Sequence, residues 1–97
     1  TVYGIYLNYY NALTTAPSEI INNMVSNSTT TGTGTRYGLN IYHVANMNIY
    51  HNSISILDGS SSSGRAMYFS KSTSTSYFAT GGVNVVNNIV SNTGNGY

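Results

Sequence analysis

The chain has 97 residues, of which 5% are charged, and its formal net charge is +1. This length allows one domain, and so few Lys and Arg residues argue against a nucleic-acid partner or a polybasic membrane-surface module. The absence of cysteine excludes disulfides and thiolate metal sites, and no apolar run approaches the roughly 18 residues of a membrane span.

The uncharged polar residues predict an all-β chain. Asn, Ser and Thr supply 14, 14 and 12 residues, whereas Glu and Lys occur once each and Gln is absent. Asn, Ser and Thr side chains compete with the helical backbone for hydrogen bonds, so no helix is expected. Disorder is the alternative for so polar a chain, but 40% of the residues are hydrophobic and they occur in spaced clusters rich in Ile, Val and Tyr.

The first predicted strand spans residues 3–7, and similar strands follow at 37–41 and 65–69. Inward and outward positions alternate along each segment, which is typical of a strand with one buried face. Aligning the three segments predicts two buried columns, formed by Ile5, Leu39 and Met67 and by Leu7, Ile41 and Phe69. The residues between these columns are expected on the opposite, outer face, and they are Tyr6, Asn40 and Tyr68.

A second predicted strand in each repeat contains an Asn in the same sequence context. The order in each repeat is an aliphatic residue, two variable positions, the Asn, one variable position, an aliphatic residue and Ser. The three Asn residues are Asn23, Asn52 and Asn88, and they are 29 and 36 positions apart. The flanking aliphatic residues predict two more buried columns, formed by Ile20, Ile49 and Val85 and by Val25, Ile54 and Val90.

Together the two sets of segments divide a single unit, residues 1–97, into three coils of about 1–34, 35–64 and 65–97. Each coil is expected to hold two strands, a third short strand after the Asn, and connecting turns rich in Gly, Ser and Thr. A repeat of this size cannot bury its apolar face alone, but it can when neighbouring repeats stack on it.

The segments around Asn23, Asn52 and Asn88 resemble the right-handed parallel β-helix, the pectate-lyase-like solenoid. The resemblance implies that each Asn occupies a tight turn and stacks on the Asn of the next coil. Asn tolerates a left-handed backbone, and its amide can both donate to and accept from a neighbouring coil. A small antiparallel sandwich is the competing fold, although it gives no reason for an Asn in register. Two departures are an insertion at residues 11–18 and Ala66 in place of the glycine at positions 4 and 38.

No catalytic site, metal site or cofactor is predicted, so the chain is not expected to be an enzyme. Glu19 and Asp58 are the only acidic residues and lie at different positions of the repeat, which leaves no carboxylate pair for glycoside chemistry. His43 and His51 lack a third metal ligand. His43 shares its column with Tyr9 and is expected to face outward, while His51 is expected beside the Asn column.

Two kinds of surface position are candidates for interaction or modification. Tyr6 and Tyr68 could stack on sugar rings or on a partner protein, or they could form a ladder that stabilises the sheet. Asn27 begins the tripeptide Asn-Ser-Thr, an acceptor sequence for N-glycosylation. The Ser and Thr tracts at 29–35, 60–63 and 72–76 are candidates for O-glycosylation.

These observations favour a structural role outside the cell or at its surface. The sequence shows no capping segment at either end, so we expect an open stack that continues head to tail, between copies or within a longer polypeptide. The expected partners are therefore the protein itself and glycans. The alternative is a non-catalytic segment of a secreted β-helix protein that degrades polysaccharide or binds carbohydrate.

Overall fold

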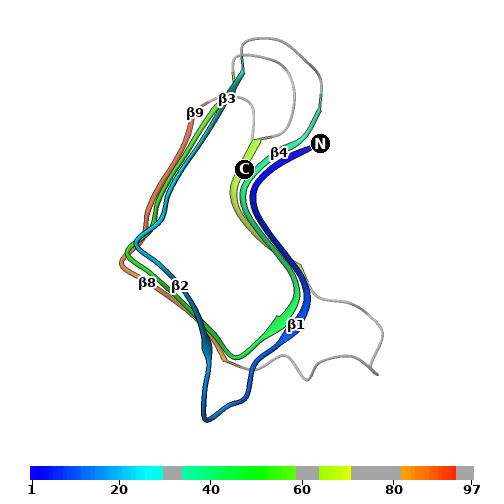
Figure 1. Ribbon diagram of the computed structural model, residues 1–97. Helices are drawn as coiled ribbons and strands as arrows, with labels where there is room; N and C mark the ends of the chain where they lie inside the picture. Colours follow the sequence, from blue (N-terminus) through cyan, green and yellow to red (C-terminus); the bar gives the residue numbers. More distant parts are fainter. Residues whose placement is uncertain (30–33, 59–63, 71–81, 94–97) are drawn as a thin grey trace.

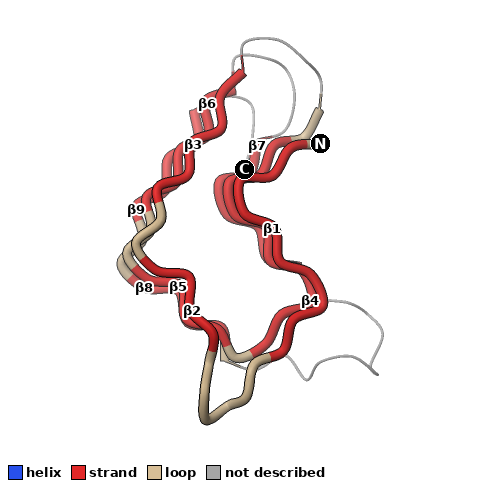
Figure 2. Tube along the Cα trace, in the orientation of Figure 1, coloured by secondary structure: helices blue, strands red, loops and turns tan. Residues whose placement is uncertain are grey.

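The structure, a computed structural model, describes residues 1–29, 34–58, 64–70 and 82–93. These residues form nine β-strands and no helix (Figures 1 and 2). The first coil contains β1 (Val2–Asn11), β2 (Ser18–Ile21) and β3 (Met24–Thr29). The second contains β4 (Arg36–Ala45), β5 (Met47–Tyr50) and β6 (Ser53–Asp58). The third contains β7 (Gly64–Ser70), β8 (Val83–Val86) and β9 (Ile89–Thr93).

The strands form three parallel sheets, each of which takes one strand from every coil. The strand orders are β1-β4-β7, β2-β5-β8 and β3-β6-β9, and all six pairings are parallel. The coils lie almost in projection on one another in Figure 1, and the smallest dimension of the molecule is 15 Å. Three strands spaced by about 4.8 Å span roughly 10 Å from the first to the third, so the stack of strands makes up most of that thickness. The all-β class is therefore confirmed, and the arrangement is compatible with a β-solenoid.

The strand register confirms all four predicted columns. In the first sheet, Ile5, Leu39 and Met67 lie opposite one another, as do Leu7, Ile41 and Phe69. In the other two sheets the matched sets are Ile20, Ile49 and Val85 and then Val25, Ile54 and Val90. Burial, however, is complete only in the second coil, since that coil alone is covered on both sides. Every second-coil member of these columns is buried, whereas Phe69, Val85 and Val90 of the third coil are exposed.

The corner beside the Asn column differs from the prediction in one respect. The left-handed residues are Asn22, His51 and Asn87, with φ between 54° and 57°, and not the Asn residues that follow them. Asn and His are among the non-glycine residues that adopt this conformation most readily. All three corner residues are exposed, whereas the Asn after each of them is buried or half-buried. One residue therefore turns the chain, and the next places its amide inside the corner.

A second bend crosses β1 and β4 at Tyr9 and His43, which also have positive φ values of 54° and 55°. His43 was expected to face solvent, but it is only 5% exposed. The rings of Tyr9 and Tyr42 cover it, with centroids 4.4 Å and 3.6 Å from the imidazole. Asn40, also expected on an open outer face, is 6% exposed. The imidazole is thus enclosed by one ring from the first coil and one from its own strand, and Asn40 lies between Tyr6 and Tyr68 in register.

The first sheet packs closely against the third at a glycine in each of the first two coils. A Cβ atom placed on Gly38 would collide with Ile54 of β6 and lie 2.6 Å from the carbonyl oxygen of Ala66 in the next coil. Gly4 has the same relation to Val25 and to the carbonyl of Gly38. Glycine is required here because both the opposite sheet and the next coil leave no room for a side chain.

The insertion of the first coil lies between β1 and β2. A single residue, Asn46, joins the equivalent strands β4 and β5 of the second coil, whereas residues 12–17 form a loop that extends beyond the outline of that coil (Figure 1). In this loop the N–H of Ala16 donates to the carbonyl of Leu13 at 3.1 Å. The insertion therefore leaves the register of β2 with β5 intact.

Candidate functional site

The Asn residues predicted to stack, Asn23, Asn52 and Asn88, do form one hydrogen-bonded column. The backbone N–H and the Nδ2 group of Asn23 both donate to Oδ1 of Asn52, each at 3.0 Å. Asn52 donates in the same two ways to Oδ1 of Asn88, each at 2.9 Å. Its Nδ2 group also donates back to the carbonyl of Ile20 at 2.9 Å. The Oδ1 atoms of Asn52 and Asn88 therefore accept from the preceding coil. The backbone N–H and Nδ2 groups that donate to them belong to the Asn one coil earlier.

The two end members of the column carry a bond that the central one lacks. Nδ2 of Asn23 donates to the carbonyl of Ile21, and Nδ2 of Asn88 donates to that of Val86, both at 3.1 Å and both two residues back in the same coil. Asn52 makes no such local bond, because its Nδ2 group is occupied by the coils on either side. At each end of the column, the local bond therefore satisfies the Nδ2 hydrogen that a further coil would otherwise accept.

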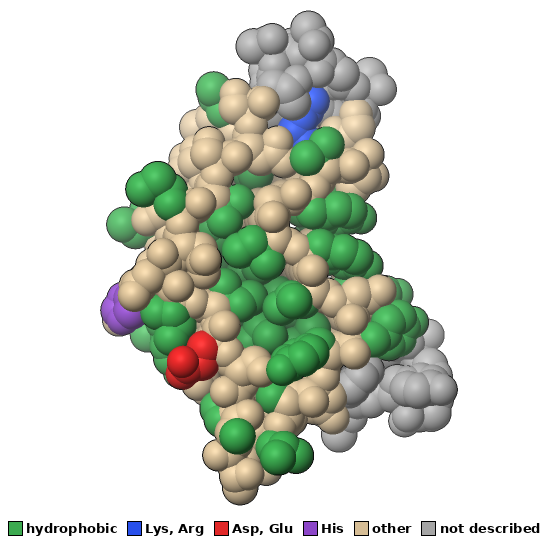
Figure 3. All heavy atoms as spheres, in the orientation of Figure 1, with side chains coloured by type: hydrophobic (Ala, Val, Ile, Leu, Met, Phe, Trp, Pro, Cys, Tyr) green, Lys and Arg blue, Asp and Glu red, His purple; other side chains and the backbone are tan. Residues whose placement is uncertain are grey.

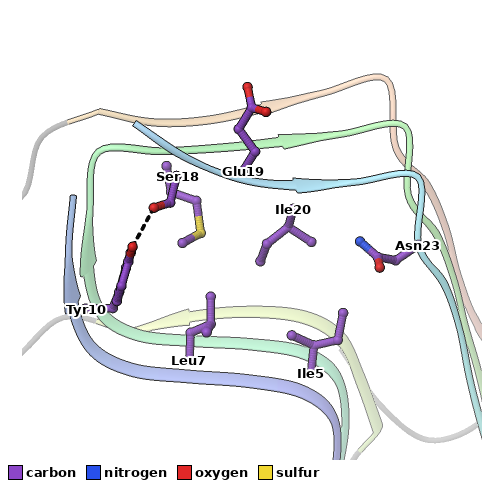
Figure 4. A pocket seen from close by; sticks show the side chains of 8 residues that line it. Ile5, Leu7, Tyr10, Ser18, Glu19, Ile20 and Asn23 are labelled. Atoms are coloured by element: carbon purple, nitrogen blue, oxygen red, sulfur yellow. Dashed lines mark hydrogen bonds between the residues drawn. The ribbon is translucent and has the colours of Figure 1, made fainter. Parts of the chain in front are cut away.

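The open side of the first coil contains a pocket of about 420 Å³ (Figure 4). Its lining residues are Ile5, Leu7, Tyr10, Ser18, Glu19, Ile20, Asn23 and Met47. The side chains of Ile5, Leu7 and Ile20 converge on its centre, and Glu19 points away from it at the rim (Figure 4). A hydrogen bond of 2.7 Å between the hydroxyl groups of Tyr10 and Ser18 closes one side. In a view along the stacking direction, hydrophobic side chains fill the interior of the ring of strands (Figure 3). The pocket is thus the uncovered end of the apolar interior.

The open side of the third coil has the same strand order and the matching columns. Phe69 continues the Leu7 column, Val85 the Ile20 column and Val90 the Val25 column. Among the described residues, no strand pairs with the outer edges of β7, β8 and β9 or with those of β1, β2 and β3. Such edges present rows of backbone N–H and C=O groups that can template another strand.

A strip of tyrosines joins the two predicted stacking residues, Tyr6 and Tyr68. The rings of Tyr6 and Tyr3 stack with centroids 4.6 Å apart, and Tyr3 stacks on Tyr37 at 5.1 Å. The Tyr37 and Tyr68 rings follow at 5.4 Å. The guanidinium of Arg65 lies 4.5 Å from the Tyr68 ring centroid, a distance suited to a cation–π contact.

Tyr6 and Tyr68 therefore belong to a continuous strip, which contains Tyr3, Tyr6, Tyr37, Arg65 and Tyr68. The sequence analysis did not predict that Tyr6 and Tyr68 are connected, because it considered the column that contains Tyr6 and not the column three residues earlier in each coil. That column, Tyr3, Tyr37 and Arg65, was available in the alignment. Asn40 lies between Tyr6 and Tyr68 in register, and its Oδ1 atom is buried without a donor among the described residues.

Asn27, the candidate for N-glycosylation, lies in β3 opposite the buried Ile56. Its Nδ2 atom, to which a glycan would be attached, is buried and has no partner among the described residues. The folded arrangement therefore does not favour modification at Asn27. The Ser tracts at 60–63 and 72–76 and most of the Thr tract lie outside the described residues.

Within the described ranges, no group of three His, Asp or Glu side chains is close enough to hold a metal ion. Within the same ranges, no helix long and apolar enough to cross a membrane occurs. Comparisons with protein families, curated proteins and solved structures find no match to this chain.

Proposed function

We propose that this chain is a structural section of an extracellular β-solenoid fibre or surface adhesin, built as a right-handed parallel β-helix, in which coils stack end to end. The observation that carries the proposal is the correspondence of the two open sides. Both present three strand edges in the same order, with side-chain columns in the same register as those that join the coils internally. Right-handed crossovers are the rule for parallel strands connected within one sheet.

The chemistry of the two sides supports stacking over other forms of self-association. The first coil offers an apolar pocket lined by Ile5, Leu7 and Ile20, and the third offers exposed Phe69 and Val85 in the matching columns. A contact between unlike surfaces does not close on itself and so generates open filaments. With 5% charged residues, the chain has little electrostatic repulsion to oppose association.

We expect Val85→Lys to weaken self-association by about tenfold or more, because stacking would bury an unpaired ammonium group. Sedimentation velocity over a concentration series measures the change, and negative-stain electron microscopy of the parent chain tests for filaments. Leu57→Lys is the matched control. The two residues are similarly exposed, Leu57 by 53% and Val85 by 44%, but Leu57 lies on the outer face of β6, away from the stacking surface. A parent chain that stays monomeric at every concentration would contradict the proposal.

The third coil also carries one feature that resists stacking. Ala66 stands where the other coils have glycine, and a following coil in the internal register would bring its carbonyl against the Ala66 methyl group. Ala66→Gly is therefore expected to strengthen self-association by about threefold to tenfold, as relief of overpacking outweighs the entropy cost of glycine. The same sedimentation series measures this change, and equal or weaker association would show that the methyl group does not limit the contact.

A second candidate function is carbohydrate binding on the tyrosine strip. It is favoured by the stacked rings of Tyr3, Tyr6 and Tyr37 and by the buried Oδ1 atom of Asn40, which has no donor among the described residues. Aromatic faces stack on sugar rings, and an amide oxygen accepts a bond from a hydroxyl group. Titration with a panel of neutral and acidic oligosaccharides, with Tyr6→Ala as the variant and Tyr50→Ala as the control, tests this candidate.

A further inference from the structure

We infer that the two ends of the Asn column form a polar junction between copies, in which Asn88 of one copy donates to Oδ1 of Asn23 in a second copy. This inference rests on the proposed function and specifies which groups fix the direction and register of stacking. The partner is a second copy of this chain, since the junction would repeat the contacts that already join its own coils.

The first step of the argument is the direction of the hydrogen bonds. Asn52 and Asn88 accept at Oδ1 from the coil before them, and Asn23 and Asn52 donate their backbone N–H to the coil after them. At the open side of the first coil, Oδ1 of Asn23 has no donor among the described residues. At the open side of the third coil, the N–H of Asn88 has no acceptor among them. One side of the chain thus lacks a donor and the other lacks the corresponding acceptor.

The second step concerns the remaining Nδ2 hydrogen bonds. Nδ2 of Asn52 donates to the carbonyl of Ile20, and Nδ2 of Asn88 donates to the carbonyl of Ile49. In each case the acceptor belongs to the preceding coil and lies three residues before the Asn of that coil. The equivalent acceptor for Asn23 is the carbonyl of Val85 in a second copy. On stacking, Asn23 can exchange its local bond to Ile21 for this carbonyl, and Asn88 can exchange its bond to Val86 for the partner's Asn23.

The third step is that other arrangements of the two sides are unfavourable. Two first coils placed together would oppose the Oδ1 acceptors of two Asn23 side chains. Two third coils would leave the N–H groups of Asn88 without acceptors. Enclosing such groups without partners is costly, so the Asn column selects head-to-tail association while the apolar columns alone would not.

The experiment uses two copies of the 97-residue chain, each blocked on one side. The first carries Leu7→Lys, which blocks the pocket and leaves Asn88 available, and the second carries Val85→Lys, which leaves Asn23 available. Each copy alone should be monomeric, and an equimolar mixture should form a heterodimer with a dissociation constant measurable by sedimentation.

Into this pair we introduce Asn88→Ala in the first copy and Asn23→Ala in the second. Each change should weaken the heterodimer about tenfold, and the two together should weaken it by less than the product of the separate effects, because either change removes the bond from Nδ2 of Asn88 to Oδ1 of Asn23. Asn84→Ala and Asn8→Ala are the controls in the third and first coils. Circular dichroism and urea titration establish that each copy remains folded. Asn88→Asp keeps the internal acceptor for Asn52 but opposes a carboxylate to Asn23, so it should also weaken the heterodimer about tenfold.

The outcomes separate the two proposals. Absence of a heterodimer between the blocked copies would overturn end-to-end stacking itself. A heterodimer whose affinity changes no more with the Asn23 and Asn88 variants than with the Asn8 and Asn84 controls would overturn the junction and leave stacking intact. Independent, additive losses at Asn23 and Asn88 would also overturn it, because the bonds proposed are shared between them.

Discussion

Asn52→Leu is expected to lower the free energy of unfolding by roughly 1–3 kcal/mol, since buried polar partners are left unsatisfied. Asn52 is 2% exposed and accepts two hydrogen bonds from Asn23 at its Oδ1 atom. Its Nδ2 group donates to Asn88 and to the carbonyl of Ile20. Leucine restores none of these bonds, although it matches the volume of the side chain. Urea denaturation followed by circular dichroism measures the change.

The comparison that isolates the effect is Asn8→Leu, which places the same side chain at an exposed position of β1 and should change stability by less than about 0.5 kcal/mol. Asn23→Leu should fall between the two, because Asn23 contacts another coil on one side only. Equal stability losses for Asn52→Leu and Asn8→Leu would show that the column contributes nothing to the fold.

Gly38→Ala is expected to destabilise the fold by about 1–3 kcal/mol through overpacking. The added methyl group would collide with Ile54 of the opposite sheet and lie 2.6 Å from the carbonyl oxygen of Ala66. The carbonyl belongs to the paired backbone of β7, so it cannot rotate away as the end of a long side chain could. Thermal unfolding monitored by circular dichroism measures the loss.

Gly34→Ala serves as the control, because the nearest atom to an added Cβ there is the backbone nitrogen of Thr1 at 3.4 Å. We expect that substitution to change stability little. Ile54→Ala should cost less stability in the Gly38→Ala chain than in the parent chain, since it removes the Cγ2 methyl group that the added Cβ would meet. No destabilisation by Gly38→Ala would mean that the sheets can move apart at this position.

The register of the strands was predictable because two patterns agree in every coil. Period-two alternation assigns Ile5 and Leu7 to one face, and a one-residue slip in any coil would reverse that face. The Asn in the next strand fixes the register independently. Insertions between coils change the spacing between the Asn residues without changing which residues face inward, so they did not obscure the match.

The left-handed corner was not assigned correctly because two coils have an Asn pair there. Either member of Asn22-Asn23 or Asn87-Asn88 could adopt a positive φ on residue type alone. His51-Asn52 in the second coil does not distinguish the positions either, since His and Asn both tolerate this conformation. Residue type alone therefore leaves the position of the turn open, and the backbone geometry places it at the first residue of each pair.

Burial in the outer coils was less predictable than register. Phe69 and Val85 have the sequence pattern of core residues and lie in core columns, yet each is 44% exposed because no described strand covers the third coil. The opposite error occurred at His43, which the rings of Tyr9 and Tyr42 cover, and at Asn40, which lies between Tyr6 and Tyr68 in register. Periodicity reports the direction of a side chain, whereas burial depends on what lies in the coils above and below.

The parallel sheets also determine how such a stack would respond to mechanical load. The hydrogen bonds between β1, β4 and β7, and those of the other two sheets, run along the stacking direction and not across it. Tension along that direction is therefore shared at once by all three sheets and by the Asn column. A force applied sideways to one strand edge would instead open the bonds one after another. Along the length of a fibre of such sections, the weakest cross-section would be the contact beside Ala66.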